Sequence, residues 1–261
     1  MNLHFTKYQG TGNDFIIIDN RKRQYDKLPV ATLCHPKFGV GADGLMLLQL
    51  IEGYDFEMVY YNSDGNISSM CGNGGRCMVD FARRLGVFQG DRTNFKAIDG
   101  PHEAIWTNDW IELKMQDVKQ VDVNTEGHYI LDTGSPHYVI FTDNIQQIDI
   151  IPAARQIRYN DTFRARGINV NFVEVTNPSE IKVRTYERGV ENETLSCGTG
   201  VTASAIALSR HLPSAPGFRK VSISTPGGEL EVKYQATDQI TDVWLCGPAT
   251  KVFEGDMLIE S

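Results

Sequence analysis

Two cysteines in the chain each begin a glycine-rich stretch. Cys71 opens "CGNGGRC" and Cys197 opens "CGTG", and apolar residues at helical spacing follow both stretches. Each stretch is interpreted as a glycine turn followed by a helix. Each cysteine is therefore predicted to lie at the N-terminus of a helix. The partial positive charge of such an end lowers the pKa of a thiol from about 8.5 toward neutrality. The amides of the first helical turn also bind anions, so each motif predicts an activated thiol beside an anion-binding site.

If the two helix ends face each other, they could act on the two faces of one α-amino acid. The amides of Gly72, Asn73, Gly198 and Thr199 would hold its carboxylate. One thiolate would remove the α-proton and the opposite thiol would return a proton to the other face. The predicted reaction is inversion at the α-carbon, with the two cysteines titrating as a coupled pair.

Other interpretations of the cysteines and of the motifs fit less well. Cys34 and Cys246 are interpreted as small core residues, and Cys77 as a packing residue within the first helix. The cysteine spacing lacks the CxxC pattern and paired histidines of a zinc site. The sequence has no GxxxxGK[ST] loop, no GxSxG elbow and no GxGxxG in a dinucleotide-binding context. The glycine-rich "GVGADG" at 39–44 matches none of these patterns.

The composition is that of a folded domain and limits the partners. The 261 residues carry a formal net charge of -8, and 41% of them are hydrophobic. This negative balance argues against nucleic acid and against an anionic membrane surface as partners. No run has the length of a membrane span, and the first residues lack the apolar segment of a signal peptide. Five scattered cysteines indicate reduced thiols and a cytoplasmic location.

The two cysteine motifs belong to a longer internal repeat. Strand-like "FEMVYYN" and "IKVRTYER" precede them, and "AIDGPHEAI" and "STPGGELEV" follow as turns between strands. The stretches "GTGNDFIII" and "DTGSPHYVI" lie upstream in the same order. We therefore expect two lobes, residues 1–117 and 118–248, with the strand-like 249–261 returning to the first lobe. Each lobe is expected to be of the α/β (α+β) class, a strand-rich layer wrapped on one central helix.

The ordered set of motifs across nearly the whole chain resembles the diaminopimelate epimerase family. The matching segments are "GTGNDF", "GVGADG", "YNSDG", "CGNGGRC", "INVNF", "YERG", "SCGTG" and "TPGG". Each is modest alone, but the set is highly specific. The resemblance implies strongly curved, mostly antiparallel sheets in two pseudo-symmetric lobes.

The resemblance also implies an activity and a set of site residues. The enzyme would interconvert LL- and meso-diaminopimelate in lysine and cell-wall precursor biosynthesis, as a homodimer with closing lobes, using neither pyridoxal phosphate nor metal. Cys71 and Cys197 match the two catalytic bases. The carboxylate-binding residues match Gly72, Asn73, Gly198 and Thr199, and the other substrate-binding residues match Asn13, Asn62, Asn169, Arg188 and, for an ammonium group, Glu187.

Several of these positions also have structural interpretations. Arg188 can bind the distal carboxylate of the substrate bidentately, while the amides of Asn62 and Asn169 fix its stereochemistry. However, an asparagine in a turn often bonds its own backbone, as Asn13 and Asn169 could. An arginine beside a glutamate is often a solvated ion pair.

One triplet departs from the family pattern. Ser135-Pro136-His137 stands where the family commonly has Asn-Pro-His. A serine hydroxyl is shorter than an amide and has one donor instead of two, so Ser135 departs from the substrate contact that the family's asparagine would make. His137 either orients the substrate amine or the cysteine, or it is a buried imidazole with satisfied hydrogen bonds; the sequence leaves both open.

Rival functions make different demands on the same residues. Proline-racemase-like isomerases use paired thiols but typically carry His where Asn73 stands, and their substrate has no distal carboxylate for Arg188. The phenazine-pathway isomerases share the fold but lack the cysteine pair. A non-catalytic redox or binding protein could use two low-pKa thiols to form a disulfide.

Overall fold

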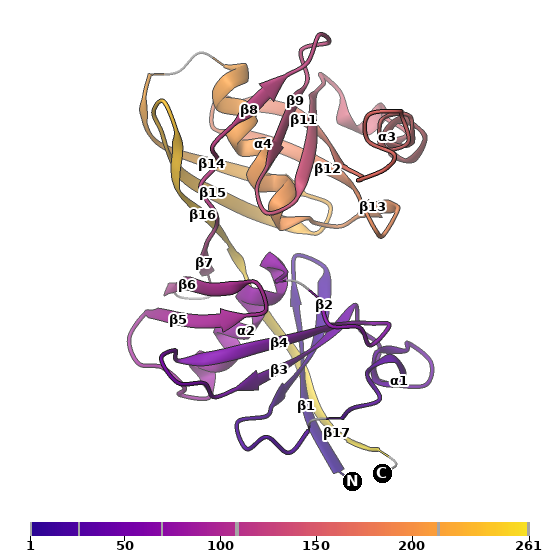
Figure 1. The fold of residues 1–261 in the computed structure, drawn as a ribbon, viewed down its shortest axis with the longest axis vertical. Helices are drawn as coiled ribbons and strands as arrows, with labels where there is room; N and C mark the ends of the chain where they lie inside the picture. The colour runs from indigo at the N-terminus through magenta and orange to yellow at the C-terminus, as the bar shows by residue number, and fades with distance from the viewer. Residues whose placement is uncertain (1, 26, 69, 108–109, 213–214, 260–261) are drawn as a thin grey trace. The chain divides into compact units, whose positions relative to one another are not determined.

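The computed structural model describes residues 2–25, 27–68, 70–107, 110–212 and 215–259. They form two compact units: unit 1 is Met1–Leu113 with Gly247–Ser261, and unit 2 is Lys114–Cys246. Both units are mostly sheet with few helices, so the predicted α+β class is confirmed (Figure 1).

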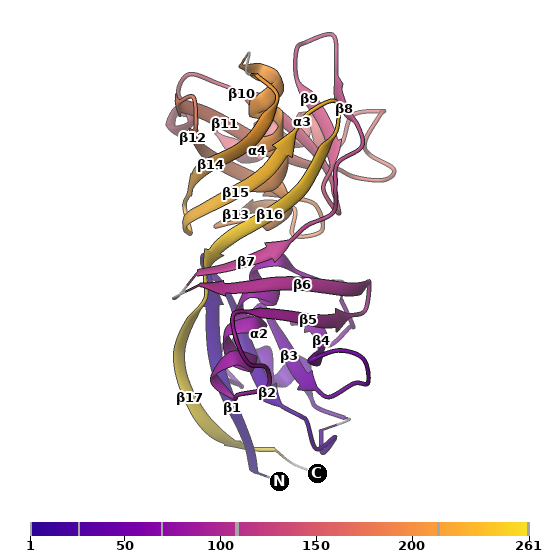
Figure 2. The same cartoon turned by 90° about the vertical axis from the view of Figure 1, so that its left-hand side faces the viewer.

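Unit 1 is a mixed sheet around a central helix. Its strands are β1 (Asn2–Gly10), β2 (Asn13–Asp19), β3 (Gly44–Gln49), β4 (Phe56–Asn62), β5 (Arg92–Ala97), β6 (Gly100–Thr107), β7 (Trp110–Lys114) and β17 (Thr250–Leu258). Its helices are α1 (Val30–Cys34) and α2 (Gly72–Arg84). The strands pair in the order β17-β1-β2-β3-β4-β5-β6-β7, parallel at β2–β3 and β4–β5 and antiparallel elsewhere. Figure 2 shows the C-terminal strand β17 alongside β1.

Unit 2 repeats this topology. Its strands are β8 (Val121–Val123), β9 (Tyr129–Asp132), β10 (Pro136–Phe141), β11 (Asn169–Asn177), β12 (Glu180–Glu187), β13 (Asn192–Thr194), β14 (Gly217–Thr225), β15 (Gly228–Ala236) and β16 (Ile240–Pro248). Its helices are α3 (Ile150–Arg158), α4 (Gly198–His211) and the short 3-10 helix η1 (Ile145–Gln147). The order is β8-β9-β10-β11-β12-β14-β15-β16, parallel at β10–β11 and β12–β14, and β13 pairs with β12 in addition.

The repeat seen in the sequence thus recurs as a repeat of strand pairing. The same sequence of parallel and antiparallel neighbours occurs in both units, and each unit inserts a helix between its first parallel pair of strands. The turns predicted in "AIDGPHEAI" and "STPGGELEV" are confirmed between β5 and β6 and between β14 and β15.

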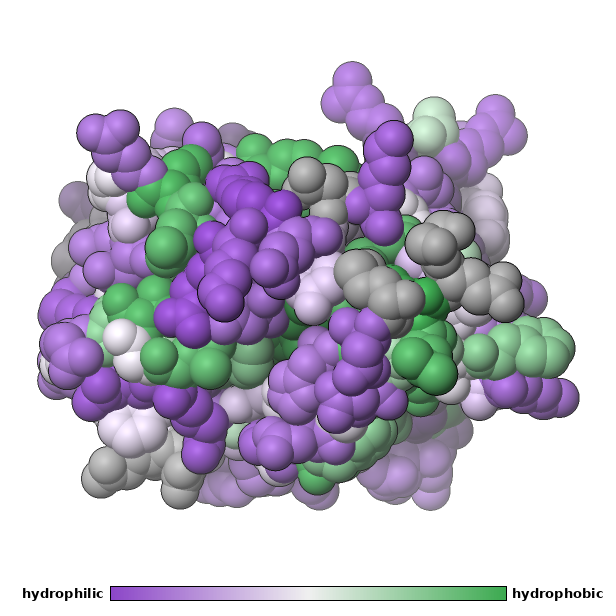
Figure 3. Space-filling model, turned by 90° about the horizontal axis from the view of Figure 1, so that it is seen from below, coloured by the Kyte–Doolittle hydropathy of each residue, from purple (hydrophilic) through white to green (hydrophobic). Residues whose placement is uncertain are grey.

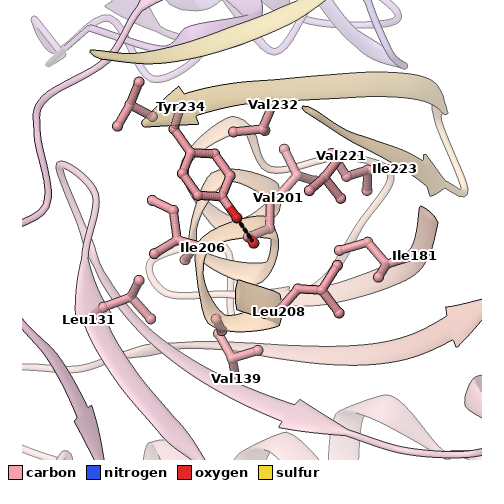
Figure 4. Close-up of a cluster of buried hydrophobic side chains, with 14 of the residues drawn as sticks. Leu131, Val139, Ile181, Val201, Ile206, Leu208, Val221, Ile223, Val232 and Tyr234 are labelled. Atoms are coloured by element: carbon pink, nitrogen blue, oxygen red, sulfur yellow. Dashed lines mark hydrogen bonds between the residues drawn. The ribbon is translucent and has the colours of Figure 1, made fainter. Parts of the chain in front are cut away.

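Each unit folds around one helix. In unit 1, α2 packs against β1, β2, β3, β4 and β6; in unit 2, α4 packs against β9, β10, β11, β12, β14 and β15. Figure 4 shows the core of unit 2, where Val201, Ile206 and Leu208 of α4 lie among side chains of the surrounding strands. Burying each such side chain stabilises the fold by about 1.5–3 kcal/mol. The hydroxyl of Tyr234 donates to the carbonyl of Ala205 at 2.8 Å, which satisfies the polar end of this large ring.

The surface carries large apolar side chains as well as polar ones. On the face seen in Figure 3, apolar patches alternate with hydrophilic side chains. On β17, Val252, Phe253 and Leu258 are each about half exposed or more, with Leu258 at 83%. Among the described residues, no helix has both the length and the apolar character needed to cross a membrane.

Candidate active site

Both predicted cysteines occupy the N-cap position of the central helix of their unit. Cys71 precedes α2 and Cys197 precedes α4, and both have extended backbone angles. The carbonyl of each accepts the first helical hydrogen bond, from Gly75 at 2.7 Å and from Val201 at 2.9 Å. Neither thiol caps its own helix. The sulfurs therefore stand at the end where first-turn amides have no carbonyl partner within the helix and the dipole is positive.

The glycines after each cysteine lie inside the helix and not in a turn before it, which corrects the predicted glycine turn. Their role is close packing. A Cβ on Gly75 would lie 2.5 Å from the Met70 side chain, and a Cβ on Gly200 would lie 2.4 Å from Oδ1 of Asn171. Glycine is required at Gly200, because Asn171 is held in place by its own hydrogen bonds; at Gly75 the neighbour is the mobile end of a methionine side chain.

The strand register gathers the other predicted residues at one end of each sheet. In unit 1, Phe15 of β2 pairs with Gly44 of β3, and Gly44 pairs with Asn62 of β4. The parallel strands β2 and β3 begin at the same edge of the sheet, and the antiparallel strand β4 ends at that edge. Asn13 and Asn62 therefore lie at the same edge. In unit 2, His137 of β10 pairs with Asn169 of β11, next to the end of β12.

A polar network leads to Cys71 in unit 1. The Sγ of Cys71 donates to Oδ1 of Asn13 at 3.5 Å, and Nδ2 of Asn13 donates to Asp43 at 2.6 Å. The amide of Asp43 donates to Oδ1 of Asp14 at 2.9 Å, and Asp14 pairs with buried Lys7 at 2.6 Å. Asn13 therefore uses its side chain on the cysteine and on a charged network, not on its own backbone.

A buried arginine supports the start of α2. Arg76 has no exposed surface, and its guanidinium donates to the carbonyl of Gly72, to Oδ1 of Asn73 and to the hydroxyl of Thr11, at 3.1–3.4 Å. It also reaches the carbonyl of Pro248 at 3.4 Å. Burying this charge is tolerable only because several oxygens surround it. Asn73 is itself 2% exposed, so its side chain serves the helix start.

A chain of neutral groups leads to Cys197 in unit 2. Nδ2 of Asn171 donates to the carbonyl of Tyr138 at 3.2 Å and to Nδ1 of His137 at 3.0 Å. Because a carbonyl can only accept, it fixes the orientation of the amide, and Nδ1 of His137 must be an acceptor. The proton of the neutral imidazole is then on Nε2, which lies 2.9 Å from Oγ1 of Thr199. Thr199 accepts this bond, which leaves its hydroxyl proton for Sγ of Cys197 at 3.5 Å.

Burial keeps the imidazole of His137 neutral. His137 has no exposed surface. Burial first, and the positive charge of Arg188 second, lower the pKa of His137 to about 3. His137 is therefore a buried imidazole with satisfied hydrogen bonds, as one of the two interpretations expected. Its partner Thr199 also contacts Sγ of Cys197.

Three distant segments of unit 2 meet at Ser135. Its hydroxyl accepts from Nδ2 of Asn169 at 2.9 Å and from Nη2 of Arg188 at 3.3 Å. Asn169 also accepts from the backbone amide of Arg188 at 2.8 Å and is 3% exposed. Ser135, the residue that departs from the family pattern, is thus bound by both Asn169 and Arg188. Because its oxygen accepts both bonds, its own hydroxyl proton points to neither residue.

The remaining predicted residues lie at strand ends. Asn62 is exposed at the end of β4, and Glu187 is the last residue of β12, directly before exposed Arg188. The packing prediction for Cys34, Cys77 and Cys246 is confirmed, because all three are buried and form no disulfide. Burial raises the pKa of Cys34 to about 11 and raises the pKa of Cys77 as well, so neither resembles an activated thiol.

Sequence reasoning did not single out Asp43, Asn171 or Arg76. Asn171 stands two residues after Asn169, so on a strand the two asparagines share one face, and a polar pair on a buried strand was a usable signal. Asp43 lies in the "GVGADG" segment, whose motif was noted but not its carboxylate. No local signal marks Arg76, since an arginine on a helix is usually exposed.

The chain is similar to known proteins in sequence and in fold. A family model described as diaminopimelate epimerase matches residues 5–121 and 129–252. The diaminopimelate epimerase of Flavobacterium psychrophilum is 49% identical over 253 residues, covering 95% of this chain and 97% of that protein. The enzyme of Aquifex aeolicus is 36% identical over 275 residues, covering 97% of each.

Solved structures with little sequence identity share the fold. A PhzF-family phenazine biosynthesis protein of Bacillus anthracis has a TM-score of 0.77 at 13% identity, covering 99% of this chain and all of that one. A hydroxyproline epimerase of Agrobacterium vitis has a TM-score of 0.69 at 13% identity, covering 98% of this chain and 92% of that one. At this identity the likeness concerns the fold alone.

Proposed function

Because the chain belongs to the diaminopimelate epimerase family, we propose that it interconverts LL- and meso-diaminopimelate by inverting one α-carbon. One observation carries the proposal: each of two topologically repeated units presents a cysteine at the N-cap of its central helix. Inversion in both directions requires two acid–base groups, one for each face of the carbon. A duplicated fold with one thiol in each copy supplies that pair.

The proposed reaction is a proton transfer at each face of the α-carbon. This mechanism requires the sulfurs of Cys71 and Cys197 to act on opposite faces of this carbon. The thiolate form of one takes the α-proton, and the electron pair of the broken C–H bond delocalises into the neighbouring carboxylate. The thiol of the other gives its proton to the opposite face, so the two sulfurs exchange protonation states. The first-turn amides at Gly72, Asn73, Gly198 and Thr199 stabilise the charge that develops on the carboxylate.

We propose that the second amino-acid end of the substrate binds at the strand ends. Arg188 lies there with its guanidinium already ordered by Ser135 and by the carbonyl of Arg166 at 3.1 Å. Asn62 would contact the same end, and Asn169 would act by holding Ser135 and the backbone of Arg188. Glu187 would bind an ammonium group. His137 would keep Thr199 oriented as a donor to Cys197, and Asn13 would orient Cys71.

The wider setting is proposed on the same basis. The reaction would serve lysine and cell-wall precursor biosynthesis in the cytoplasm, and two thiols suffice for it without a metal or an organic cofactor. We further propose a homodimer with lobes, corresponding to units 1 and 2, that close on the substrate. The exposed apolar side chains of β17 give a surface for association, and light scattering on the purified chain tests the dimer.

Hydrogen exchange in deuterated water tests the function. The reduced protein is incubated with LL-diaminopimelate, and both isomers are recovered and analysed by mass spectrometry and NMR. We expect deuterium at one α-carbon of the meso product and of the returned LL substrate. Absence of α-deuterium in both isomers would reject the proposal. Proline, tested in parallel, should gain no deuterium; exchange of proline instead of diaminopimelate would support a proline-racemase-like activity.

A further inference from the structure

The segment that carries Arg188 is a tight turn closed by Glu191. The amide of Glu191 donates to the carbonyl of Glu187 at 2.8 Å, which spans the turn. Within it, Gly189 has φ +92 and Glu191 has φ +57. A glutamate in the left-handed region is strained, so contacts made by this residue must hold it there.

The carboxylate of Glu191 makes those contacts with both of its oxygens. Oε1 accepts from Arg158 at 2.9 Å and 3.2 Å and from the amide of Gly189 at 3.2 Å. Oε2 accepts from the hydroxyls of Tyr159 at 2.8 Å and Tyr186 at 3.0 Å. Burial raises the pKa of Glu191, but these donors outweigh burial and lower the pKa to about 2. The carboxylate is therefore a charged junction at neutral pH.

The donors come from rigid parts of unit 2. Arg158 is the last residue of α3 and Tyr159 follows it as the C-cap. The helix packs on β11 and β12, and its buried Ile150 and Ala154 share a hydrophobic cluster with Tyr186. Because the side chain of Glu191 is held by residues of α3 and β12, the backbone of Glu191 is fixed relative to the sheet.

The opposite side of the turn leaves Arg188 little room. Its backbone amide is bound by Asn169, and its guanidinium reaches Arg166 and Ser135. A Cβ on Gly167 would lie 2.5 Å from Cδ of Arg188 and 3.1 Å from Cζ of Arg158, so the two arginine side chains pass over the same glycine. A small shift of the turn would therefore move the guanidinium out of its present place.

We propose that Glu191 is a positioning residue, whose links to Arg158, Tyr159 and Tyr186 hold Arg188 ready for the distal carboxylate of the substrate. This inference rests on the proposed function. Glu191 would not contact the substrate itself. It would act on substrate capture through Arg188 and would take no part in proton transfer.

The test distinguishes the loss of the carboxylate contacts from the effect of backbone strain at Glu191. Glu191→Gly removes the side chain but tolerates φ +57 better than any other residue, whereas Glu191→Ala keeps the strain without the contacts. Since a displaced binding group lowers capture without touching the reacting centre, we expect Glu191→Gly to raise KM for LL-diaminopimelate about 10-fold with kcat nearly unchanged. Asp161→Ala, which breaks an exposed ion pair with Arg164 just beyond α3, is the matched control and should leave KM unchanged.

Two further measurements decide the interpretation. In an Arg188→Ala background, Glu191→Gly should add no further rise in KM, because the residues act through one contact. Amide hydrogen exchange of residues 187–193, measured without substrate, should accelerate in Glu191→Gly and not in Asp161→Ala. A folded Glu191→Gly variant with wild-type KM, or an equal KM rise without Arg188, overturns the proposal. Wild-type protein that exchanges no α-proton overturns the proposed function instead, while the exchange data still report whether Glu191 holds the turn.

Discussion

The start of α2 and the start of α4 present the same thiol in different chemical surroundings. Cys71 contacts an amide oxygen of Asn13, within a network that contains an aspartate–lysine pair. Cys197 contacts the hydroxyl of Thr199, which receives a hydrogen bond from neutral His137. The duplication preserved the helix and its cysteine, and the neighbours of the sulfur diverged.

This difference predicts unlike resting protonation states for the two sulfurs. An amide oxygen accepts a proton from a thiol and offers nothing to a thiolate, so the contact with Asn13 favours the protonated form of Cys71. A hydroxyl whose acceptor side is occupied donates, so the contact with Thr199 favours the thiolate form of Cys197. Opposite protonation states are what a two-base inversion needs before substrate binds.

The fifth residue after each cysteine shows the same divergence. Arg76 donates to the carbonyl of Gly72 at 3.3 Å, and Thr202 donates to the carbonyl of Gly198 at 2.8 Å. Both side chains bind the carbonyl four residues earlier, at the first residue of the helix. Arg76, however, also connects the helix to Thr11 and to Pro248, whereas the hydroxyl of Thr202 bonds within its own helix.

The largest predicted effect removes either sulfur. Cys71→Ala and Cys197→Ala should each lower the epimerisation rate about 10³-fold, because a positioned acid–base group contributes about that much. Isomer conversion followed by chiral chromatography measures the loss, with Cys34→Ala as the control for removing a buried thiol. Wild-type epimerisation by one of the two variants would show that its sulfur is not a required base, and the comparison of paired thiols would fail.

A smaller effect concerns stability and contrasts the fifth residues. Arg76→Met should lower the free energy of unfolding by about 3 kcal/mol, because several buried oxygens lose a charged donor. Thr202→Val should cost about 1 kcal/mol, since one neutral hydrogen bond is lost and the shape is kept. Urea denaturation measures both. If Thr202→Val cost as much as Arg76→Met, the arginine would not have the connecting role described here.

Local signals in the sequence were sufficient to predict the repeated framework. Alternating and β-forming residues predicted β4, β12 and the C-terminal β17. The cysteine–glycine stretches followed by apolar residues at helical spacing predicted α2 and α4. These features depend on neighbours within a few residues along the chain. The predicted glycine turn was wrong because the helices begin directly after the cysteines. At Gly200 the requirement for glycine comes from a tertiary contact with Asn171.

Long-range contacts of the site could not be predicted in this way. The orientation of His137 depends on Asn171, which lies on the neighbouring parallel strand, and no spacing in the sequence sets that register. The link from Glu191 to Arg158 joins residues 33 positions apart. The side chains of Asn73 and Asn169 also bond within the protein, because a buried polar side chain must be satisfied whether or not a ligand is bound.

The neutral imidazole of His137 in unit 2 predicts a specific pH dependence of the free energy of unfolding. Because the pKa of His137 is about 3 in the folded chain, against an ordinary value of 6.5, the unfolded state binds the extra proton between these values. This contribution to stability is present above pH 6.5 and is lost as pH falls, by about 2 kcal/mol between pH 7 and pH 5. His137→Gln keeps a neutral donor without this titration. Urea denaturation of both proteins across pH should show the variant losing less stability; parallel curves would mean that the imidazole is not held neutral.

The smallest predicted effect tests the unlike resting states of the sulfurs. Iodoacetamide reacts with thiolate, so alkylation at one cysteine, compared between a variant and the wild type, reports its protonation with access held nearly constant. Thr199→Val removes the donor to Cys197 and should slow alkylation there several-fold, while leaving Cys71 unchanged. Asn13→Ala removes the acceptor from Cys71 and should speed alkylation there by a smaller factor, since one weak hydrogen bond of 3.5 Å is lost.

Peptide mass spectrometry at early times measures both sites in one sample. Changes of the same sign in the two variants would show that the contacts of the sulfurs do not set opposite states, and the asymmetry between α2 and α4 would then be one of packing alone.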